Sequence, residues 1–291
     1  MGNGARNMSE IDHTGIRVSE LFYSIQGEGL YVGVPSIFLR MFGCNFTCSG
    51  FSMPRGELSQ ERFDVDPSEY DEYKKLPLVH TGCDSYASWD PRFKHLSNWM
   101  THDEIIGKMK ELLPGEKFSR DKHLILTGGE PMLWQAKLPE MIDSLDMHRM
   151  NAQNITIETN GTQMIEEKFK DKLRSRREVV FSISAKLPSS GEPWKNAIKP
   201  KVIKSYINFM PNVKAYFKFV ISHENDYKDV IKAVREYELG GVNIPVYLMP
   251  AGGTTLHYEE NEKWVAELAM EHGWRYSPRV QVDIWKNSWG R

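Results

Sequence analysis

The sequence predicts an α/β fold in which a parallel β-sheet curls into a barrel or part of one. Short apolar runs rich in β-formers alternate with stretches whose apolar residues recur at helical spacing. This alternation implies consecutive βα units, and right-handed crossovers between them curve the sheet. The chain has 291 residues, of which 40% are hydrophobic and 26% charged, so it can bury a sizeable core.

Six strands are expected in order along the chain, with a weaker one near its end. They cover residues 36–42, 123–127, 154–158, 178–184, 215–221, 244–249 and, more weakly, 276–282. Between them, Thr101 and Glu104 have the spacing of a capping box ahead of an apolar helix face. The same helical spacing recurs over 227–237 and 264–269, and Gly273 stands where the last helix would end.

The chain is expected to form one domain over residues 17–291, preceded by a flexible tail over 1–16. The stretch 49–82 interrupts the pattern, because it contains Pro54, Gly56 and Pro67 and shows no clear strand or long helix. A long irregular segment in a compact domain is usually functional or disordered. We therefore interpret 49–82 as an insertion within a loop.

Charge and hydropathy exclude several classes of protein. The net charge is −2, so no broad basic surface indicates direct nucleic-acid binding. No apolar run approaches the roughly 18 residues of a membrane span. The polar start of the chain lacks the apolar core of a signal peptide, which favours a cytoplasmic location.

The three cysteines leave two interpretations open. Cys44 and Cys48 follow the first expected strand, and Cys83 comes after 34 intervening residues, 49–82. With His80 they have the four ligands of a structural zinc site. Alternatively, three thiolates hold an iron–sulfur cluster whose remaining iron is open to a small molecule.

The ends of three later strands favour the open cluster. Gly128-Gly129-Glu130-Pro131 follows one, Glu158-Thr159-Asn160-Gly161 ends the next, and Ser184-Ala185-Lys186 follows the third. Each motif alone is a common turn or a solvated loop. Their joint occurrence at successive strand ends is typical of a ligand-binding edge in βα proteins.

These motifs together resemble the radical S-adenosylmethionine superfamily, and within it the 7-carboxy-7-deazaguanine synthases. The more specific signature is Ser24-Ile25-Gln26-Gly27-Glu28-Gly29, followed by Phe38-Leu39-Arg40 and Gly43-Cys44-Asn45-Phe46-Thr47-Cys48. The resemblance runs from about Val18 to the C-terminus and implies a single-domain, distorted partial (β/α) barrel of the radical type.

The resemblance implies a lyase that converts 6-carboxy-5,6,7,8-tetrahydropterin to 7-carboxy-7-deazaguanine with release of ammonia. This is a step in 7-deazapurine biosynthesis of the queuosine type. The implied cofactors are a [4Fe–4S] cluster, S-adenosylmethionine and Mg²⁺, with a 5′-deoxyadenosyl radical that abstracts a substrate hydrogen. The implied partners are an electron donor such as flavodoxin and a second copy of the chain.

Site residues follow from the resemblance, position by position. Cys44, Cys48 and Cys83 match the cluster ligands, and Ser85 matches a magnesium-contacting Thr. The positions that match substrate contacts are Ile25, Gln26, Gly27, Arg40 and Thr127. The positions that match cofactor contacts are Gly129, Glu130, Glu158, Ser184, Ala185 and Lys186. Arg40 also suits a substrate carboxylate physically, because guanidinium binds carboxylates in a bidentate fork.

The chain departs from the family pattern at several positions. The insertion opens the compact cysteine motif, Ser85 replaces Thr, and Ala185 replaces Pro. Gln281 stands where the family often has His, which leaves contacts near Gln281, Trp285 and Arg291 open. The alternatives are another radical enzyme, such as a glycyl-radical activase, and more remotely a zinc-stabilised binding module.

Overall fold

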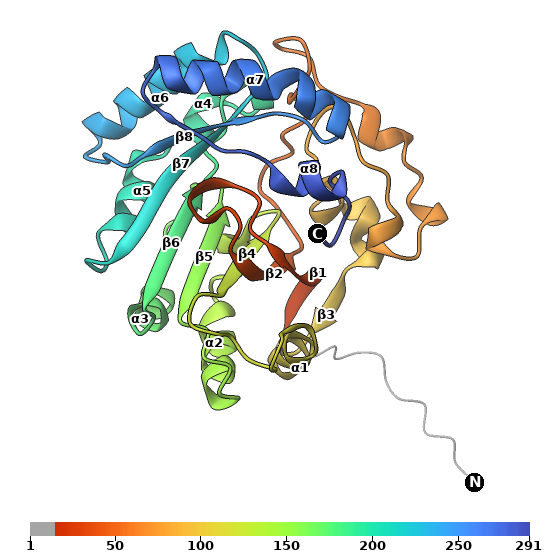
Figure 1. Ribbon diagram of the computed structural model, residues 1–291, viewed down its shortest axis with the longest axis vertical. Helices are drawn as coiled ribbons and strands as arrows, with labels where there is room; N and C mark the ends of the chain where they lie inside the picture. Colours follow the sequence, from red (N-terminus) through yellow and green to blue (C-terminus); the bar gives the residue numbers. More distant parts are fainter. Residues whose placement is uncertain (1–14) are drawn as a thin grey trace.

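A single mixed sheet of nine strands organises the computed structural model, which describes residues 15–291. Along the sheet the strands follow the order β3-β1-β2-β4-β5-β6-β7-β8-β9. Their bounds are β1 (Ile16–Ile25), β2 (Pro35–Met41), β3 (Asn98–Met100), β4 (His123–Gly128), β5 (Asn154–Thr159), β6 (Glu178–Ile183), β7 (Val213–Ile221), β8 (Val246–Pro250) and β9 (Arg275–Tyr276). β1 runs antiparallel to both of its neighbours, whereas every other neighbouring pair is parallel. The predicted α/β fold is confirmed, with a curved sheet left open between β3 and β9 (Figure 1).

Helices connect the parallel strands and lie around the outside of the curved sheet (Figure 1). Their bounds are α1 (His102–Leu112), α2 (Leu138–Met147), α3 (Glu167–Arg174), α4 (Trp194–Ala197), α5 (Pro200–Ile207), α6 (Asp226–Leu239), α7 (Thr255–Glu271) and α8 (Val280–Trp285). The predicted capping box is present at α1, where the Glu104 carboxylate accepts from Thr101 N at 2.7 Å and Thr101 Oγ1 accepts from Glu104 N at 3.3 Å. Within residues 15–291, no helix is both long and apolar enough to cross a membrane.

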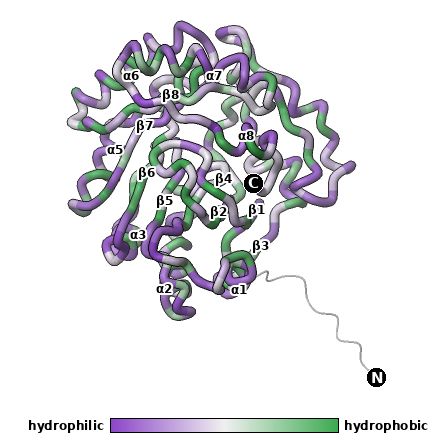
Figure 2. The backbone as a smooth tube through the Cα atoms, viewed as in Figure 1, coloured by the Kyte–Doolittle hydropathy of each residue, from purple (hydrophilic) through white to green (hydrophobic). Residues whose placement is uncertain are grey.

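The main core lies between the sheet and its helices. Strands β4, β5 and β6 are buried almost throughout, as expected for parallel strands covered on both faces. Figure 2 shows the hydrophobic residues gathered along these central strands, while α3 on the periphery is largely hydrophilic. This rigid centre fixes the positions at which the strands end, and the loops that follow them build the site.

Three expectations about elements need correction. Of the weak strand expected over 276–282, only Tyr276 pairs with β8, and residues from Val280 onward form helix α8. Pro278 interrupts the run, because proline cannot donate to a ladder. The strands β1 and β3 were not predicted, and the expected tail over 1–16 ends too late, since Ile16 is already buried in β1. The expected tail residues 1–14 lie outside the described part of the chain.

The insertion over 49–82 is folded. It contains three short 3-10 turns, η2 (Glu61–Asp64), η3 (Pro67–Glu69) and η4 (Tyr73–Lys75). Together with η5 (Tyr86–Ser88) and η6 (Pro91–Leu96), it forms a separate hydrophobic cluster around Tyr73, Tyr86 and Phe93. Trp289, close to the C-terminus, packs against this cluster, and Figure 1 shows the insertion beside the end of the chain.

Candidate active site

One pocket at the C-terminal ends of the parallel strands brings together most of the predicted site residues. Its wall includes segments that follow β1, β2, β4, β5, β6 and β8, together with the insertion and the C-terminal segment. The predicted residues that line it are Ile25, Gln26, Gly27, Arg40, Cys44, Cys48, Cys83, Ser85, Thr127, Gly129, Glu158, Ser184 and Lys186. Residues as far apart in sequence as Ile25 and Lys186 thus share one cavity, as the strand-edge argument requires.

Two predicted cofactor residues do not line this pocket. Ala185 is packed into the main core. Glu130 is completely buried, and its carboxylate accepts from Asn160 N at 2.6 Å, Thr159 Oγ1 at 2.7 Å and Met132 N at 3.0 Å. The Glu130 side chain therefore ties the end of β4 to the end of β5, beneath the pocket wall. Sequence reasoning identified the residue but not this direction of its side chain.

The three cysteines are free thiols that belong to one small hydrophobic cluster with Phe46 and Phe51. Burial raises the pKa of Cys44 to about 12, and it also raises those of Cys48 and Cys83. Phe46 N donates to Cys44 Sγ at 3.4 Å, a contact that suits a thiolate ligand.

Two glycines shape the backbone around the cysteine loop. At Gly129 a Cβ atom would lie 2.2 Å from Gly43 O and 2.9 Å from Cys44 Cβ, so only glycine fits beside the cysteine loop. Gly43 itself has φ +110° and open space where a side chain would stand. Three thiols that line one pocket are a donor set that suits an iron–sulfur cluster with one open iron.

His80, the fourth residue of the zinc alternative, lines the same pocket as the three cysteines. Its Nδ1 atom hydrogen-bonds to Thr254 Oγ1 at 3.0 Å, on the loop before α7. Among the residues that the structure describes, no three His, Cys, Asp or Glu side chains are grouped as ligands of a single metal ion.

Arg40 is held in a fixed orientation on the pocket wall. Its Nε donates to Glu20 Oε2 at 2.9 Å and its Nη1 reaches Ser85 Oγ at 3.4 Å. Burial raises the pKa of Glu20, although the Arg40 charge opposes that rise. Within residues 15–291, Nη2 of Arg40 makes no hydrogen bond, so it is available to an anion in the pocket. Ser85 Oγ also lies 3.3 Å from Asp84 Oδ1, which places two oxygen donors side by side.

Glu158 connects the substrate-side residues across the barrel. One of its carboxylate oxygens accepts from Gln26 Nε2 at 2.9 Å and the other from Thr127 Oγ1 at 2.8 Å. These three side chains come from β1, β4 and β5 or the loops after them. Lys186, after β6, donates to Ser184 Oγ at 2.8 Å and faces the ring of Phe51 at 5.6 Å.

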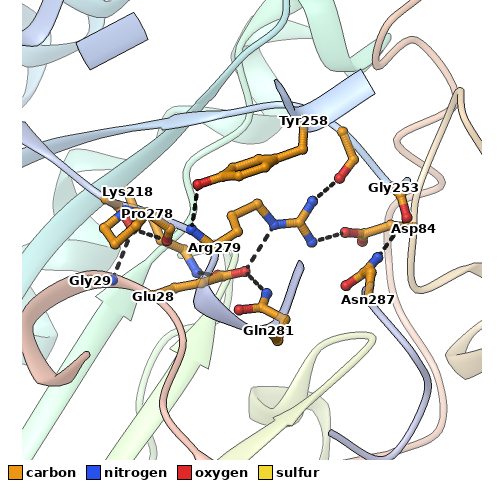
Figure 3. A network of polar contacts seen from close by, with 12 residues as sticks. Glu28, Gly29, Asp84, Lys218, Gly253, Tyr258, Pro278, Arg279, Gln281 and Asn287 are labelled. Atoms are coloured by element: carbon orange, nitrogen blue, oxygen red, sulfur yellow. Dashed lines mark hydrogen bonds and ion pairs between the residues drawn. The ribbon is translucent and has the colours of Figure 1, made fainter. Parts of the chain in front are cut away.

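A buried charge network closes the other side of the pocket (Figure 3). The Glu28 carboxylate pairs with Lys218 and accepts from Arg279 Nε at 3.2 Å and Gln281 Nε2 at 2.7 Å. Arg279 also pairs with Asp84 at 2.6 Å and donates to the carbonyl of Gly252. Burial alone would raise the pKa of Glu28, but Lys218 and Arg279 outweigh it and lower that pKa to about 2.

Sequence reasoning missed two members of this network. Lys218 lies in the middle of the apolar strand β7, and a lysine in a buried strand was the signal that would have identified it. Arg279, which is 4% exposed, was not among the predicted site residues. Of the three C-terminal positions left open, Gln281 and Arg291 line the pocket, whereas Trp285 does not.

Comparisons with known proteins agree with this geometry. No protein-family model matches the chain. Over 297 aligned residues it is 28% identical to a 7-carboxy-7-deazaguanine synthase of Halobacterium salinarum, covering 95% of this chain and 93% of the relative. It is 26% identical to a protein of the same name from Pyrobaculum aerophilum, covering 95% and 97% of the two chains.

A solved structure supports the fold. The crystal structure of QueE from Escherichia coli superposes with a TM-score of 0.51 at 18% sequence identity, covering 94% of this chain and 98% of that one. Over nearly its whole length the chain is therefore similar in sequence to proteins named 7-carboxy-7-deazaguanine synthase, and it shares the fold of the QueE structure.

Proposed function

We propose that this protein is a radical S-adenosylmethionine lyase that converts 6-carboxy-5,6,7,8-tetrahydropterin to 7-carboxy-7-deazaguanine with release of ammonia. The observation that carries the proposal is the pocket itself: three free thiols face Arg40, Gln26 and Thr127 across one cavity. The relatives named for this activity match the chain from end to end. The substrate is a small molecule, and the reaction belongs to 7-deazapurine biosynthesis.

Cys44, Cys48 and Cys83 are the proposed ligands of the [4Fe–4S] cluster. When bound, the cluster supplies the electron that cleaves S-adenosylmethionine. Gly129 keeps the wall beside Cys44 free of side-chain atoms, and the hydroxyl and amine of Ser184 and Lys186 offer polar contacts to the cofactor. The side chains of Glu130 and Ala185 support these loops from below.

Arg40 is the proposed partner of the substrate carboxylate. Glu20 holds the Nε of Arg40, so the other edge of the guanidinium already points into the pocket before substrate binds. Binding therefore costs little side-chain entropy at this position. Glu158, the predicted cofactor contact, accepts from Gln26 and Thr127 on the same pocket wall, so it links the substrate and cofactor sides of the pocket. Ile25 and Gly27 complete this wall with their main chain.

Ser85 and Asp84 are the proposed oxygen donors for Mg²⁺. Both oxygens lie beside Arg40, where a substrate carboxylate would add a third oxygen ligand. Hard divalent cations prefer such oxygen sets and usually keep several waters. We also propose a cytoplasmic location, a homodimer and a low-potential electron donor such as flavodoxin.

The decisive experiment is anaerobic turnover of the reconstituted protein with the carboxytetrahydropterin, S-adenosylmethionine and a reductant, with products identified by mass. The expected result is 7-carboxy-7-deazaguanine. Cleavage of the cofactor without this product would instead favour another radical enzyme, such as a glycyl-radical activase. Iron and sulfide analysis of the same sample should give about four irons per chain, which a single zinc site cannot accommodate.

A further inference from the structure

The two segments that carry the cysteines are connected directly, although 34 residues separate Cys48 from Cys83. Gly82 N donates to Phe51 O at 2.8 Å, and Ser59 N donates to Ser49 O at 2.7 Å. The insertion therefore leaves the cysteine loop and returns to it as a closed loop. The interval contains only short 3-10 turns, so other contacts must fix the two ends of this loop relative to each other.

Glu61, on the first of those turns, binds the chain just before Cys83. One oxygen of its carboxylate accepts from His80 N at 2.8 Å. The other accepts from both Thr81 N and Thr81 Oγ1 at 2.8 Å. The Glu61 side chain thus uses both of its oxygens on the two residues that lead into Gly82 and Cys83.

Glu192, on the loop after β6, binds the chain at Cys48 in the same way. A single oxygen of its carboxylate accepts from Thr47 N at 2.8 Å, from Cys48 N at 2.9 Å and from Thr47 Oγ1 at 3.3 Å. Cys48 has φ +48°, a left-handed conformation that is costly for a residue with a side chain. The hydrogen bonds that Thr47 and Cys48 donate to Glu192 stabilise this conformation.

Neither carboxylate has an ion-pair partner among residues 15–291. Their hydrogen bonds go to main-chain N–H groups and a threonine hydroxyl, an arrangement that fixes backbone rather than charge. On this basis, and resting on the proposed function, we propose that Glu61 and Glu192 are positioning residues that hold Cys83 and Cys48 in place for cluster assembly.

The two sites respond differently to conservative substitution, which gives a sharp test. In Glu192→Gln the remaining carbonyl oxygen can take over all three hydrogen bonds, because one oxygen accepts them in the native chain. In Glu61→Gln one of two accepting oxygens becomes an amide that cannot accept. We expect Glu192→Gln to behave like the native protein, Glu61→Gln to be intermediate, and both alanine variants to be impaired.

The first measurement is hydrogen–deuterium exchange of the full-length apoprotein, read by mass spectrometry on peptides spanning 44–52 and 78–86. Glu192→Ala should accelerate exchange in the first peptide and Glu61→Ala in the second, by about tenfold or more for each lost charge-assisted hydrogen bond. Asp64→Ala is the matched control, because Asp64 is exposed on the same turn as Glu61 and no hydrogen bond or ion pair involves its side chain within the described residues.

The second measurement is iron and sulfide content after anaerobic reconstitution, with electron paramagnetic resonance of the cluster. Both alanine variants should hold less than half of the native iron or show three-iron clusters, while Asp64→Ala and Glu192→Gln match the native protein. Native exchange rates in the alanine variants would overturn the proposal, as would fast exchange with native iron content. If the native chain assembles no cluster, the proposed function fails, and the exchange rates alone then decide whether these carboxylates fix the two segments.

Discussion

Arg40 shows how a single side chain is prepared for its ligand. Its Nε donates to Glu20 Oε2 at 2.9 Å, and both side chains are largely shielded from solvent. A lysine at this position could place one charge near the same point but could not pair with Glu20 and present a second donor edge at once. The planar, forked guanidinium of Arg40 therefore matters for binding as much as its positive charge does.

We expect Arg40→Lys to lower kcat/KM for the carboxytetrahydropterin by about a hundredfold, as for a reacting group misplaced by about an ångström. Reductive cleavage of S-adenosylmethionine should change much less, because Arg40 is not one of the proposed cluster ligands. Both activities are measured on the same anaerobic preparation. An equal loss of the two would argue against a role of Arg40 in substrate binding.

Cys83 is the proposed ligand that lies farthest from the others in sequence. We expect Cys83→Ala to abolish the four-iron cluster and cofactor cleavage together, since two thiolates cannot hold a cubane with one open iron. Iron and sulfide analysis and the cleavage assay measure the two effects. Retained cleavage would show that Cys83 is not the third ligand.

The start of helix α1 was predicted directly from the capping-box residues Thr101 and Glu104. Its reciprocal hydrogen bonds between Thr101 and Glu104 satisfy N–H groups that the first helical turn leaves free. We expect Thr101→Ala to lower the free energy of unfolding by about 1 kcal/mol, and Thr101→Ser to restore most of it. Urea unfolding monitored by circular dichroism measures the difference.

The insertion is attached to the rest of the molecule through Trp289. Its indole Nε1 donates to Leu76 O at 2.9 Å, and its ring meets Tyr73 edge-on with centroids 4.9 Å apart. We expect Trp289→Ala to lower the free energy of unfolding by about 2 kcal/mol. Trp289→Phe keeps ring packing but loses the hydrogen bond, so it should cost about half as much. Equal losses in the two variants would mean that the ring packing contributes little.

At the scale of the whole molecule, the Glu28 network joins distant parts of the chain. Glu28 follows β1, Lys218 lies on β7, Arg279 precedes α8 and Asp84 belongs to the segment after the insertion. The pKa of Glu28 falls from 4.5 to about 2, since Lys218 and Arg279 outweigh the opposing effect of burial. A lowered carboxyl pKa contributes stability that is fully present above the unfolded value and is lost as the pH falls toward the folded one.

We expect Glu28→Gln to lower the free energy of unfolding by about 3–5 kcal/mol at neutral pH, because it leaves buried Lys218 without its counter-charge. The difference from the native protein should shrink as the pH falls below 4.5 toward 2, where native Glu28 itself becomes protonated. Urea unfolding at a series of pH values tests this, with exposed Glu69→Gln as control. A difference that does not vary with pH would contradict the network.

The local pattern of apolar residues along the chain was enough to predict the parallel strands of the sheet. Strands β4 to β8 begin within two residues of the expected positions, because runs of buried apolar residues have few alternatives in a chain of this kind. The motifs that follow these strands could also be predicted to lie together, because the loops after parallel strands meet at the carboxyl edge of the sheet. Thirteen of the predicted site residues line one pocket for this reason.

Tertiary structure alone decided the rest. β1 pairs antiparallel with β2 and contains a register shift between Val18 and Glu20, so its alternation was too irregular to read as a strand. The directions of Glu130 and Ala185 depend on neighbours that no spacing specifies. The fold of the insertion and the pairing of Lys218 with Glu28 depend on contacts between residues far apart in sequence. Such contacts form only in the folded chain, so no local sequence pattern predicts them.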